Sequence, residues 1–431
     1  MKNIFTDRRK KLGKIFPSNS AIVISGASTQ YRNADSSYAF RQDSNFWYLS
    51  GFNEAESTLV ILINDSGNTE SIAFVPEKDK VKEIWDGHRA GPKGAIDDYG
   101  FDAAFNNTEI DMHLPGLLSG SKQVFYPVGK NSALDKNIVK WLKVAKSKDR
   151  HSSSIDIADA SSKLGNMRLI KDKHEIELMK KACLISAETH VEAMKFVKPG
   201  ISEQEMEAYY LYEFSKKGGR FSAYTPIVAG GENACILHYV ENSKRLNDGD
   251  LLLVDAGCEY ESYASDITRT FPISGKFNKS QLAIYEIVLE ANLKCIEAVT
   301  LNNNVMDVQI ISEKVITQGL IDLGILKGSL EDLHSSGAHK EFYMHKIGHW
   351  LGLDVHDAGD YMEDSEFMKF KPGMVTTIEP GIYIPSSSNV EDKWKGIGVR
   401  IEDDILVTSE GNENLTSSVP SDPKEIEELM A

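Results

Sequence analysis

The sequence predicts two domains, an N-terminal α/β domain and a C-terminal α+β domain. A chain of 431 residues is longer than one ordinary hydrophobic core accommodates, so two domains are expected. In the first part of the chain, strand-like apolar runs alternate with short helical segments, as in α/β layers. Later, long helical stretches and strand-like runs occur in groups, which is typical of helices covering one face of a sheet. We place the domains at residues 1–165 and 166–431.

The first domain is expected to contain buried strands, because short apolar runs are bounded there by polar residues. These runs cover residues 21–25, 57–63, 71–76 and 123–128. Short helices are expected at residues 79–84 and 137–144. Residues 151–175 are rich in serine, then basic, and contain Gly165, so we predict that they connect the two domains.

The second domain is expected to begin with two helices. Residues 174–197 carry apolar side chains at helical spacing and stop at Pro199-Gly200. Ser202 and Glu205 form a capping-box pattern that opens the next helix, which ends near Gly218. Further helices are expected at 279–300, 305–323 and 423–430, and strands at 251–257, 266–273, 374–384 and 396–408.

Composition narrows the classes of function. The net charge of −16 argues against a phosphate-binding surface, so we expect no nucleic-acid partner. Apolar runs stay well below the roughly 20 residues that span a bilayer, so no membrane partner is expected. The charged N-terminus lacks the features of a secretory signal. Scattered cysteines without a C-x-x-C pair predict free thiols in a reducing, cytoplasmic location: Cys183, Cys235, Cys258 and Cys295.

Two aspartates lie where an ionised side chain is costly. Asp255 ends the aliphatic run LLLVDAG, and burial there is unfavourable unless the charge is paired or bound to a cation. Taken alone, Asp255 can equally be a turn residue before Gly257. Asp266 opens the next strand-like run, and a hairpin of the two strands would bring both carboxylates together.

Two glutamates repeat this pattern. Glu379 lies at the end of the apolar run VTTI, and Glu402 lies in GIGVRIEDDILV. In that second run the alternation puts Arg400 and Glu402 on one face and apolar residues on the other. Four carboxylates on four strands of one domain need a common counter-charge. Two divalent cations would balance them.

Histidines supply a further type of ligand. His345 and His349 are four residues apart, so a helix would put them on one face. The residue after His345 is Lys346, so the H-E-x-x-H pattern of single-zinc proteases is absent. Gly348 and Gly352 favour instead a glycine-lined loop that lets His349 approach a metal closely. His356 follows in the same stretch of sequence, and His238 lies in ACILHYVEN. Each histidine taken alone can be structural, and His238 can be a packed residue under an ILHYV strand.

The blocks LLLVDAGCEYESYASDITRTFP, HKIGHWLGLDVHD, TTIEPGIY and GVRIEDDILVT resemble those of the "pita-bread" metallopeptidases. That family includes methionine aminopeptidase, Xaa-Pro aminopeptidase, prolidase and creatinase. The resemblance covers roughly residues 165–410 and implies a "pita-bread" fold for the second domain. Residues 33–52 and FVPEKD also resemble the N-terminal domain of the bacterial Xaa-Pro aminopeptidase. The metal ligands implied are Asp255, Asp266, His349, Glu379 and Glu402.

The resemblance implies an aminopeptidase that releases the N-terminal residue from peptides with proline second, by a hydroxide bridging two divalent metal ions. Asp266 and Glu402 would bridge the metals, Asp255 would complete one site, and His349 and Glu379 the other. Oxygen-rich ligation favours Mn²⁺, with Zn²⁺ and Co²⁺ as alternatives. Glu379 would be the proton acceptor.

The resemblance also assigns the remaining site residues. His356 would donate to the developing oxyanion, and His238 would hold a carbonyl group of the substrate. His345, Tyr361 and Arg400 would line the proline pocket, although Tyr361 can also be a plain loop aromatic. Asp35 and Trp85 would reach the site of a neighbouring subunit in a homodimer or homotetramer, which gives the first domain a role in oligomerisation and substrate access. Alternatively, Asp35 is a turn residue and Trp85 packs in a core.

Other functions stay open at this point. A prolidase shares the metal site but cleaves only Xaa-Pro dipeptides, so it would leave a tripeptide intact. A creatinase-like enzyme, or a domain of this fold that only binds peptides, would lack metal ligands that this chain has.

Overall fold

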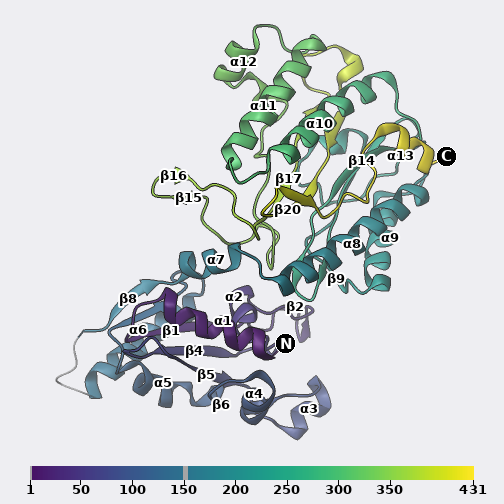
Figure 1. Ribbon diagram of the computed structural model, residues 1–431. Helices are drawn as coiled ribbons and strands as arrows, with labels where there is room; N and C mark the ends of the chain where they lie inside the picture. Colours follow the sequence, from purple (N-terminus) through teal and green to yellow (C-terminus); the bar gives the residue numbers. More distant parts are fainter. Residues whose placement is uncertain (1, 149–153) are drawn as a thin grey trace. The chain divides into compact units, whose positions relative to one another are not determined.

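The computed structural model describes residues 2–148 and 154–431. The chain divides into two compact units, Met1–Gly165 and Asn166–Ala431 (Figure 1). The first is an α/β unit and the second an α+β unit, so the fold class expected from the sequence is confirmed. Each unit is described by itself.

The first unit is built on a six-stranded mixed sheet with the order β6-β5-β4-β1-β7-β8. Strand β1 pairs antiparallel with β4 and parallel with β7, and the four strands expected from apolar runs are confirmed as β1, β4, β5 and β7. The strands are β1 (Ser20–Ser25), β4 (Thr58–Ile63), β5 (Thr69–Val75), β6 (Ala103–Asn106), β7 (Gln123–Tyr126) and β8 (Asp156–Asp159).

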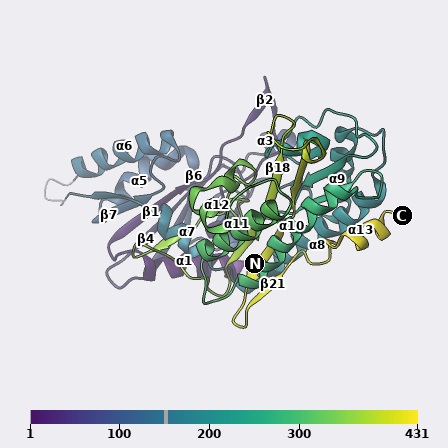
Figure 2. The same cartoon turned by 90° about the horizontal axis from the view of Figure 1, so that it is seen from above.

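Both faces of this sheet are covered. Side chains of a strand alternate in direction, so each strand contributes to the packing on both faces. Ala21 and Val23 face a core that includes Leu114 and Trp141, while Ile22 is buried on the opposite face. Figure 2 shows α5 and α6 on the opposite side of the sheet from α1. The helices of this layer structure are α1 (Lys2–Ile15), α2 (Ser44–Ser50), α4 (Gly91–Tyr99), the 3₁₀ turn η1 (Asn107–Glu109), α5 (Ile110–Leu118) and α6 (Ser132–Lys148).

Two elements of the first unit are solvent-exposed. The hairpin of β2 (Tyr31–Asn33) and β3 (Ser36–Ser37) is exposed along its length, and Asp35 lies in its turn. Every residue of α3 (Lys80–Asp86) is exposed or half-buried. Trp85 on this helix is 84% exposed, so the alternative that it packs in a core is wrong.

The segment predicted to be a connection is largely ordered. Residues 151–153 lie outside the described part of the chain, but Asp156–Asp159 form strand β8 and Ser161–Leu169 form helix α7. Strand β8 adds to the sheet edge by parallel pairing with β7. An edge strand with mostly exposed side chains has the polar composition of a linker, so the sequence pattern did not predict strand β8. The division between the two units falls inside α7.

The helices of the second unit confirm the expected pattern. Ser202 and Glu205 form the predicted capping box: the Ser202 hydroxyl accepts from the Glu205 N–H at 3.1 Å, and the Glu205 carboxylate accepts from the Ser202 N–H at 2.8 Å. The helices are α8 (Lys173–Phe196), α9 (Glu203–Lys217), α10 (Lys279–Ala298), α11 (Val305–Asp322), α12 (Leu330–Ser336) and α13 (Pro423–Leu429). The 3₁₀ turns are η2 (Gly231–Cys235), η3 (Ala338–Glu341) and η4 (Asp392–Trp394).

The strands of the second unit form several small sheets, ordered β10-β11-β14, β13-β12-β9, β17-β20-β21, β18-β19 and β15-β16. Helix α8 packs on β12 and β13, and α10 packs on β17, β18 and β19. The strands are β9 (Phe221–Ser222), β10 (Ile227–Gly230), β11 (Leu251–Asp255), β12 (Cys258–Tyr260), β13 (Tyr263–Ala264), β14 (Thr268–Pro272), β15 (Met362–Glu363), β16 (Glu366–Phe367), β17 (Val375–Ile378), β18 (Gly381–Ile384), β19 (Ile397–Arg400), β20 (Asp403–Val407) and β21 (Asn412–Asn414).

Two runs predicted as single strands are each broken into two. The first breaks at Glu379 and Pro380, between β17 and β18, and the second at Ile401 and Glu402, between β19 and β20. Proline has no N–H to donate to a ladder, so a break there is expected. The Glu402 N–H instead donates to the Thr268 carbonyl at 3.0 Å, and the Glu379 N–H to the Ile347 carbonyl at 2.8 Å. Both breaks therefore turn a carboxylate out of the strand pattern.

Among the helices that the structure describes, none combines the length and the apolar composition needed to cross a membrane. The four cysteines are free thiols as expected, and Cys183, Cys258 and Cys295 are buried.

Candidate metal centre and substrate cavity

The predicted hairpin brings the two aspartates together. Strands β11 and β14 pair antiparallel with Asp255 opposite Thr268, which puts Asp266 just beyond the end of the ladder. The Tyr224 hydroxyl lies 2.6 Å from a carboxylate oxygen of Asp255 and 2.6 Å from one of Asp266. One tyrosine proton cannot serve both oxygens at once, so this geometry keeps two carboxylates close with incomplete compensation.

The two glutamates come from the strand breaks. In the β17–β20 pair, Ile378 lies opposite Asp403, so Glu379 and Glu402 leave the ladder next to each other. The Thr268 hydroxyl donates to Glu402 at 2.6 Å, and the Thr377 hydroxyl lies 3.4 Å from Glu379. Thr268 on β14 and Thr377 on β17 therefore help to orient the two glutamate side chains.

His349 lies on a loop, so the helical alternative for His345 and His349 is wrong and the glycine-lined loop is confirmed. A Cβ atom on Gly348 would overlap the Thr377 carbonyl oxygen, so only glycine allows this close approach to β17. The His349 N–H donates to the Thr377 hydroxyl at 3.1 Å.

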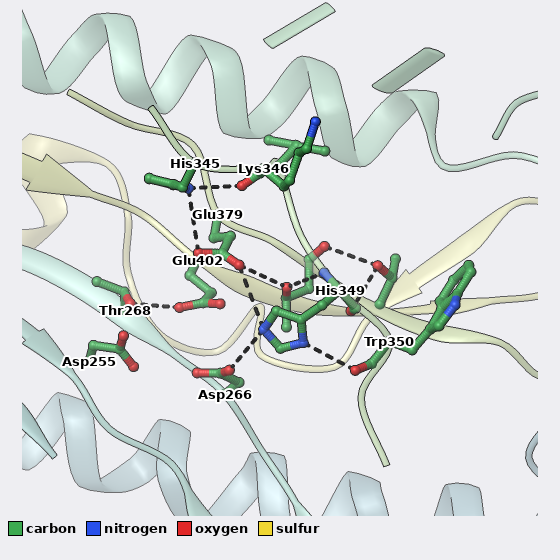
Figure 3. A network of polar contacts seen from close by, with 12 residues as sticks. Asp255, Asp266, Thr268, His345, Lys346, His349, Trp350, Glu379 and Glu402 are labelled. Carbon is green, nitrogen blue, oxygen red and sulfur yellow. Dashed lines mark hydrogen bonds and ion pairs between the residues drawn. The ribbon is translucent and has the colours of Figure 1, made fainter. Parts of the chain in front are cut away.

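These elements gather the predicted metal ligands (Figure 3). Ligand atoms of Asp266, His349 and Glu402 all lie within 4.8 Å of one another. The Nε2 atom of His349 is 3.5 Å from Asp266 and 3.6 Å from Glu379. Asp255 lies at the other side of this group, where Arg400 donates to its carboxylate at 2.6 Å. All five residues line one cavity.

Burial without full charge compensation shifts these groups strongly. Burial raises the pKa of Asp266, and the nearby charge of Asp255 adds to the shift. Burial raises the pKa of Glu379 to about 7, although the His349 charge opposes the shift. Burial and Asp266 raise the pKa of Glu402 well above its ordinary value. For His349, burial alone would lower the pKa, but Asp266 and Glu379 together raise it to about 9.

The donor set fits divalent cations. Even with Arg400 and a protonated His349 counted, four carboxylates face only two positive charges. Carboxylate oxygens with one imidazole suit hard or borderline divalent ions better than thiolate-seeking ones. Bound cations would compensate the buried negative charge and so lower these carboxyl pKa values.

His345 is held as a neutral ring beside this group. Its Nε2 atom lies 2.9 Å from the Tyr383 hydroxyl, which accepts from Arg400 at 3.0 Å and so donates to the histidine. Its Nδ1 atom lies 2.8 Å from the Lys346 carbonyl, which requires a donor there. Burial, with the Arg400 charge, lowers the pKa of His345 to about 4.

The five predicted metal ligands, called the ligand group from here on, open into a cavity of about 910 Å³, within the size range of small-molecule and peptide sites. His238, His345, His356, Tyr361 and Arg400 line it. The His356 ring lies 4.1 Å from the His349 ring, centroid to centroid. The apolar wall of the cavity consists of Ile227, Leu237, Val240, Val305, Met306, Ile347, Val355 and Phe367.

His238 differs from one expectation. Residues 236–240 form a turn and extended chain rather than a strand, and His238 is exposed at the cavity surface. The alternative of a histidine packed under a strand is therefore wrong, because the 3₁₀ turn η2 ends the regular structure just before it. Tyr361 also lines the cavity: its ring stacks on Trp350 at 4.9 Å, and its hydroxyl accepts from the Trp350 N–H at 3.0 Å.

Asp35 and Trp85 lie in the first unit, on the exposed hairpin and on the exposed helix α3. Their contribution to a neighbouring subunit's site stays a prediction.

Sequence reasoning missed several supporting residues. Tyr224 and Thr268 contact the predicted metal ligands, and Tyr383 contacts His345 and Arg400. Each is an ordinary strand or loop residue in the sequence. Asp404 accepts from the Asp266 N–H at 3.0 Å and from the Cys183 thiol at 3.3 Å. In the sequence, the only indication of Asp404 is the run of acidic residues after Ile401.

Comparisons with known proteins identify the family of this chain. The model of metallopeptidase family M24 matches residues 177–409, and that of the aminopeptidase P N-terminal domain matches residues 5–126. The chain is 41% identical to an Xaa-Pro aminopeptidase from Escherichia coli (strain K12) over 99% of its length and 97% of the relative's.

Solved structures agree in fold. The aminopeptidase PepP of Pseudomonas aeruginosa superposes with a TM-score of 0.97 at 44% identity, covering 100% of this chain and 98% of that one. A zinc-substituted Escherichia coli aminopeptidase P in complex with product has a TM-score of 0.97 at 41% identity, covering 100% and 98%.

A buried carboxylate and histidine group on this α+β fold defines a metallopeptidase. The chain belongs to metallopeptidase family M24, with an aminopeptidase P N-terminal domain ahead of the catalytic domain. The resemblance seen in the sequence is confirmed.

Proposed function

We propose that this chain is an Xaa-Pro aminopeptidase that acts with two divalent metal ions, preferably Mn²⁺. The observation that carries the proposal is the convergence of five ligand-type side chains in one cavity. Two bacterial relatives that match nearly the whole chain are named Xaa-Pro aminopeptidase, which favours this activity over that of a dipeptidase.

Asp255, Asp266, His349, Glu379 and Glu402 would hold the metals. Bound divalent ions lower the pKa of water and polarise a carbonyl group. Asp266 and Glu402, each of which lies beside other carboxylates, would contribute to holding both metal ions. Mn²⁺ is preferred because the donors are mostly oxygen, with Zn²⁺ or Co²⁺ as alternatives.

Glu379 is the proton acceptor in this proposal. Its carboxylate lines the cavity, where it can take a proton and pass it to the leaving nitrogen. His356, whose ring lies 4.1 Å from that of His349, would donate to the oxygen that gains charge. His238, exposed on the cavity surface, would hold a carbonyl of the substrate.

Proline as the second residue suits this cavity. The scissile bond is then a tertiary amide without an N–H, so no acceptor is needed there. His345, Tyr361 and Arg400 would line the ring's pocket, and the large apolar wall offers surface for it. Arg400 is buried and pairs with Asp255, so it would act by shape and by fixing that ligand.

Activity on a short peptide panel tests the proposal. Xaa-Pro-Xaa tripeptides should be cleaved after the first residue in added Mn²⁺, while matched peptides with alanine second should be cleaved poorly. A chain that hydrolyses only Xaa-Pro dipeptides would be a prolidase instead.

Metal content gives the independent test. Purified protein, or chelator-treated protein after reloading, should bind divalent ions. Protein that neither holds nor takes up such ions would contradict the proposal, and would favour a domain that only binds peptides.

An oligomer in the cytoplasm completes the proposal. Val81, Ile84 and Trp85 on α3 are 67%, 80% and 84% exposed, an apolar surface that a second copy of the chain would cover. Asp35 and Trp85 would then meet the neighbouring subunit's substrate. Sedimentation of the protein should give a dimer or tetramer, and Trp85→Ala should raise KM more than it lowers kcat.

A further inference from the structure

A second buried group of charged side chains lies beside the loop that carries His349. It consists of Arg168 near the end of α7, Lys171 just before α8, and Asp357. The three side chains are 3%, 1% and 1% exposed. Lys171 donates to one Asp357 oxygen at 3.0 Å, Arg168 donates to the other, and Arg168 also donates to Asp354 at 2.7 Å. We call these residues the Asp357 cluster.

The Asp357 cluster closes the loop that follows His349. The Asp357 N–H donates to the Trp350 carbonyl at 2.8 Å, and the Asp354 N–H lies 3.3 Å from the Asp357 carboxylate. Gly352 lies against the same carboxylate, and a Cβ atom at Gly352 would overlap an Asp357 oxygen. The chain from Trp350 to Asp357 is therefore wrapped around one carboxylate.

The same Trp350 carbonyl also orients His349. The Nδ1 atom of His349 lies 3.1 Å from this carbonyl, which has two lone pairs and can accept from both residues. A proton on Nδ1 leaves the lone pair on Nε2, the atom that lies 3.5 Å from Asp266. A hydrogen bond from the far nitrogen of a histidine ligand to a carbonyl fixes both the tautomer and the ring orientation.

Regular structure does little to hold this loop. Within the described residues, 342–361 form no helix or strand, and Trp350 makes only an isolated bridge with Thr376. The Leu351 N–H is bound by the Val375 carbonyl, which anchors the beginning of the loop to β17. Beyond Gly352, the Asp357 cluster supplies the charged anchor. His356 precedes Asp357 directly, so the cluster also limits where its ring can lie.

We propose that Arg168, Lys171 and Asp357 are positioning residues that hold His349 in the orientation required to bind a metal ion. They act through the Trp350 carbonyl and do not touch the metal or the substrate. Because a buried ion group adds little net stability compared with apolar packing, its value here is one defined loop conformation. The inference rests on the proposed metal site but not on the choice of peptide.

The test compares metal binding in Asp357→Asn and in a matched control, Glu213→Gln. Glu213 also holds two lysines, Lys216 at 3.1 Å and Lys217 at 3.0 Å, but on α9 and outside the cavity lining. Mn²⁺ affinity is measured by calorimetry on chelator-treated protein, together with the visible spectrum of the Co²⁺-loaded protein and the unfolding temperature.

We expect Asp357→Asn to weaken the binding of one metal ion by about 10- to 100-fold and to change the Co²⁺ spectrum. Glu213→Gln should lower the unfolding temperature while leaving affinity and spectrum unchanged. An Asp357→Asn protein with wild-type affinity and spectrum, whatever its unfolding temperature, would overturn the proposal.

Lys171→Met keeps the test decisive where Asp357→Asn does not fold. It leaves Arg168 on the carboxylate, so the expected loss of affinity is smaller, about threefold to tenfold. Unchanged affinity in Lys171→Met would also overturn the proposal. Failure of the wild-type protein to cleave any Xaa-Pro peptide would contradict the proposed function, yet the metal measurements would still decide this inference.

Discussion

Two buried groups of charged side chains lie within one unit of this protein, and they differ in charge balance. In the Asp357 cluster two cations, Arg168 and Lys171, meet the buried carboxylate of Asp357, and the partly exposed Asp354 supplies a second carboxylate to Arg168. In the ligand group four carboxylates face Arg400 and His349. A balanced group can hold a loop, whereas an unbalanced one is incomplete until cations bind. The imbalance, rather than burial, marks the binding site.

Three consecutive acids show the same contrast at the scale of single residues. Burial and Asp266 raise the pKa of Glu402 well above its ordinary value. Burial would also raise the pKa of Asp403, but Arg269, which donates to it at 2.7 Å, lowers it instead. The pKa of Asp404 is again raised well above its ordinary value by burial and by Asp266. Neighbours in the sequence therefore differ because each faces a different partner.

The largest expected effect is on turnover. Glu379→Gln should lower kcat by about 10³-fold, because the amide cannot accept the proton that the carboxylate takes. Circular dichroism should show an unchanged fold, since an amide fits the place of a buried carboxyl with a raised pKa. Near-normal peptide hydrolysis by this variant would refute the role of Glu379.

Neutralising one carboxylate in each group should change stability in opposite directions. In metal-free protein, Asp357→Asn should lower the free energy of unfolding by about 3–5 kcal/mol, because Lys171 loses its carboxylate partner and Arg168 keeps only the partly exposed Asp354. Glu402→Gln should leave it unchanged or raise it by about 1 kcal/mol, because it relieves repulsion while the Thr268 hydroxyl can still donate to the amide oxygen. Urea denaturation measures both. Changes of the same sign and size would break the comparison.

His190 sharpens the comparison as a buried group that stays neutral. It lies 2.9 Å from the Ala256 carbonyl and 3.0 Å from the Tyr210 hydroxyl, and burial lowers its pKa to about 4. The unfolded chain takes up the proton first, near pH 6.5, so stability is fully present above that pH and is lost as the pH falls to about 4. The expected loss is about 3 kcal/mol.

The measurement is the free energy of unfolding as a function of pH in metal-free wild-type and His190→Gln proteins. The variant should lack this part of the slope. Parallel curves between pH 6.5 and pH 4 would show that His190 is protonated in the folded state.

The smallest effect is on thermal stability in the presence of metal. Mn²⁺ at 100 times its dissociation constant should stabilise the protein by about 2.7 kcal/mol per site, because it binds the folded chain. The unfolding temperature should rise by roughly 5–10 °C. Glu402→Gln should respond much less. If Mn²⁺ does not change the unfolding temperature of the wild-type protein, the ligand group does not need cations to offset its unbalanced charge.

Much of the ligand group could be predicted because each carboxylate lies within an apolar run or at one of its ends. Asp255 and Glu379 stand out in this way, and burial of their neighbours makes an isolated charge costly. The strand breaks at Glu379 and Glu402 could not be predicted, because their backbone groups are satisfied by Ile347 and Thr268, which are distant in sequence.

The Asp357 cluster was hidden for the same reason. Arg168 and Lys171 lie in a basic, polar stretch that is typical of a linker, and their partner follows 189 and 186 residues later. Polar composition suggested exposure, but these side chains are almost completely buried.

The sequence by itself determined the fold class, the family and the presence of acidic residues that needed cations, because apolar periodicity and ordered motifs are local properties. Only the tertiary structure decided which histidine nitrogen faces Asp266, which carboxylates stay unbalanced and which are neutralised by Arg168, Lys171 or Arg269. The energy of a buried charge depends on partners a few ångströms away, and folding alone brings those partners together.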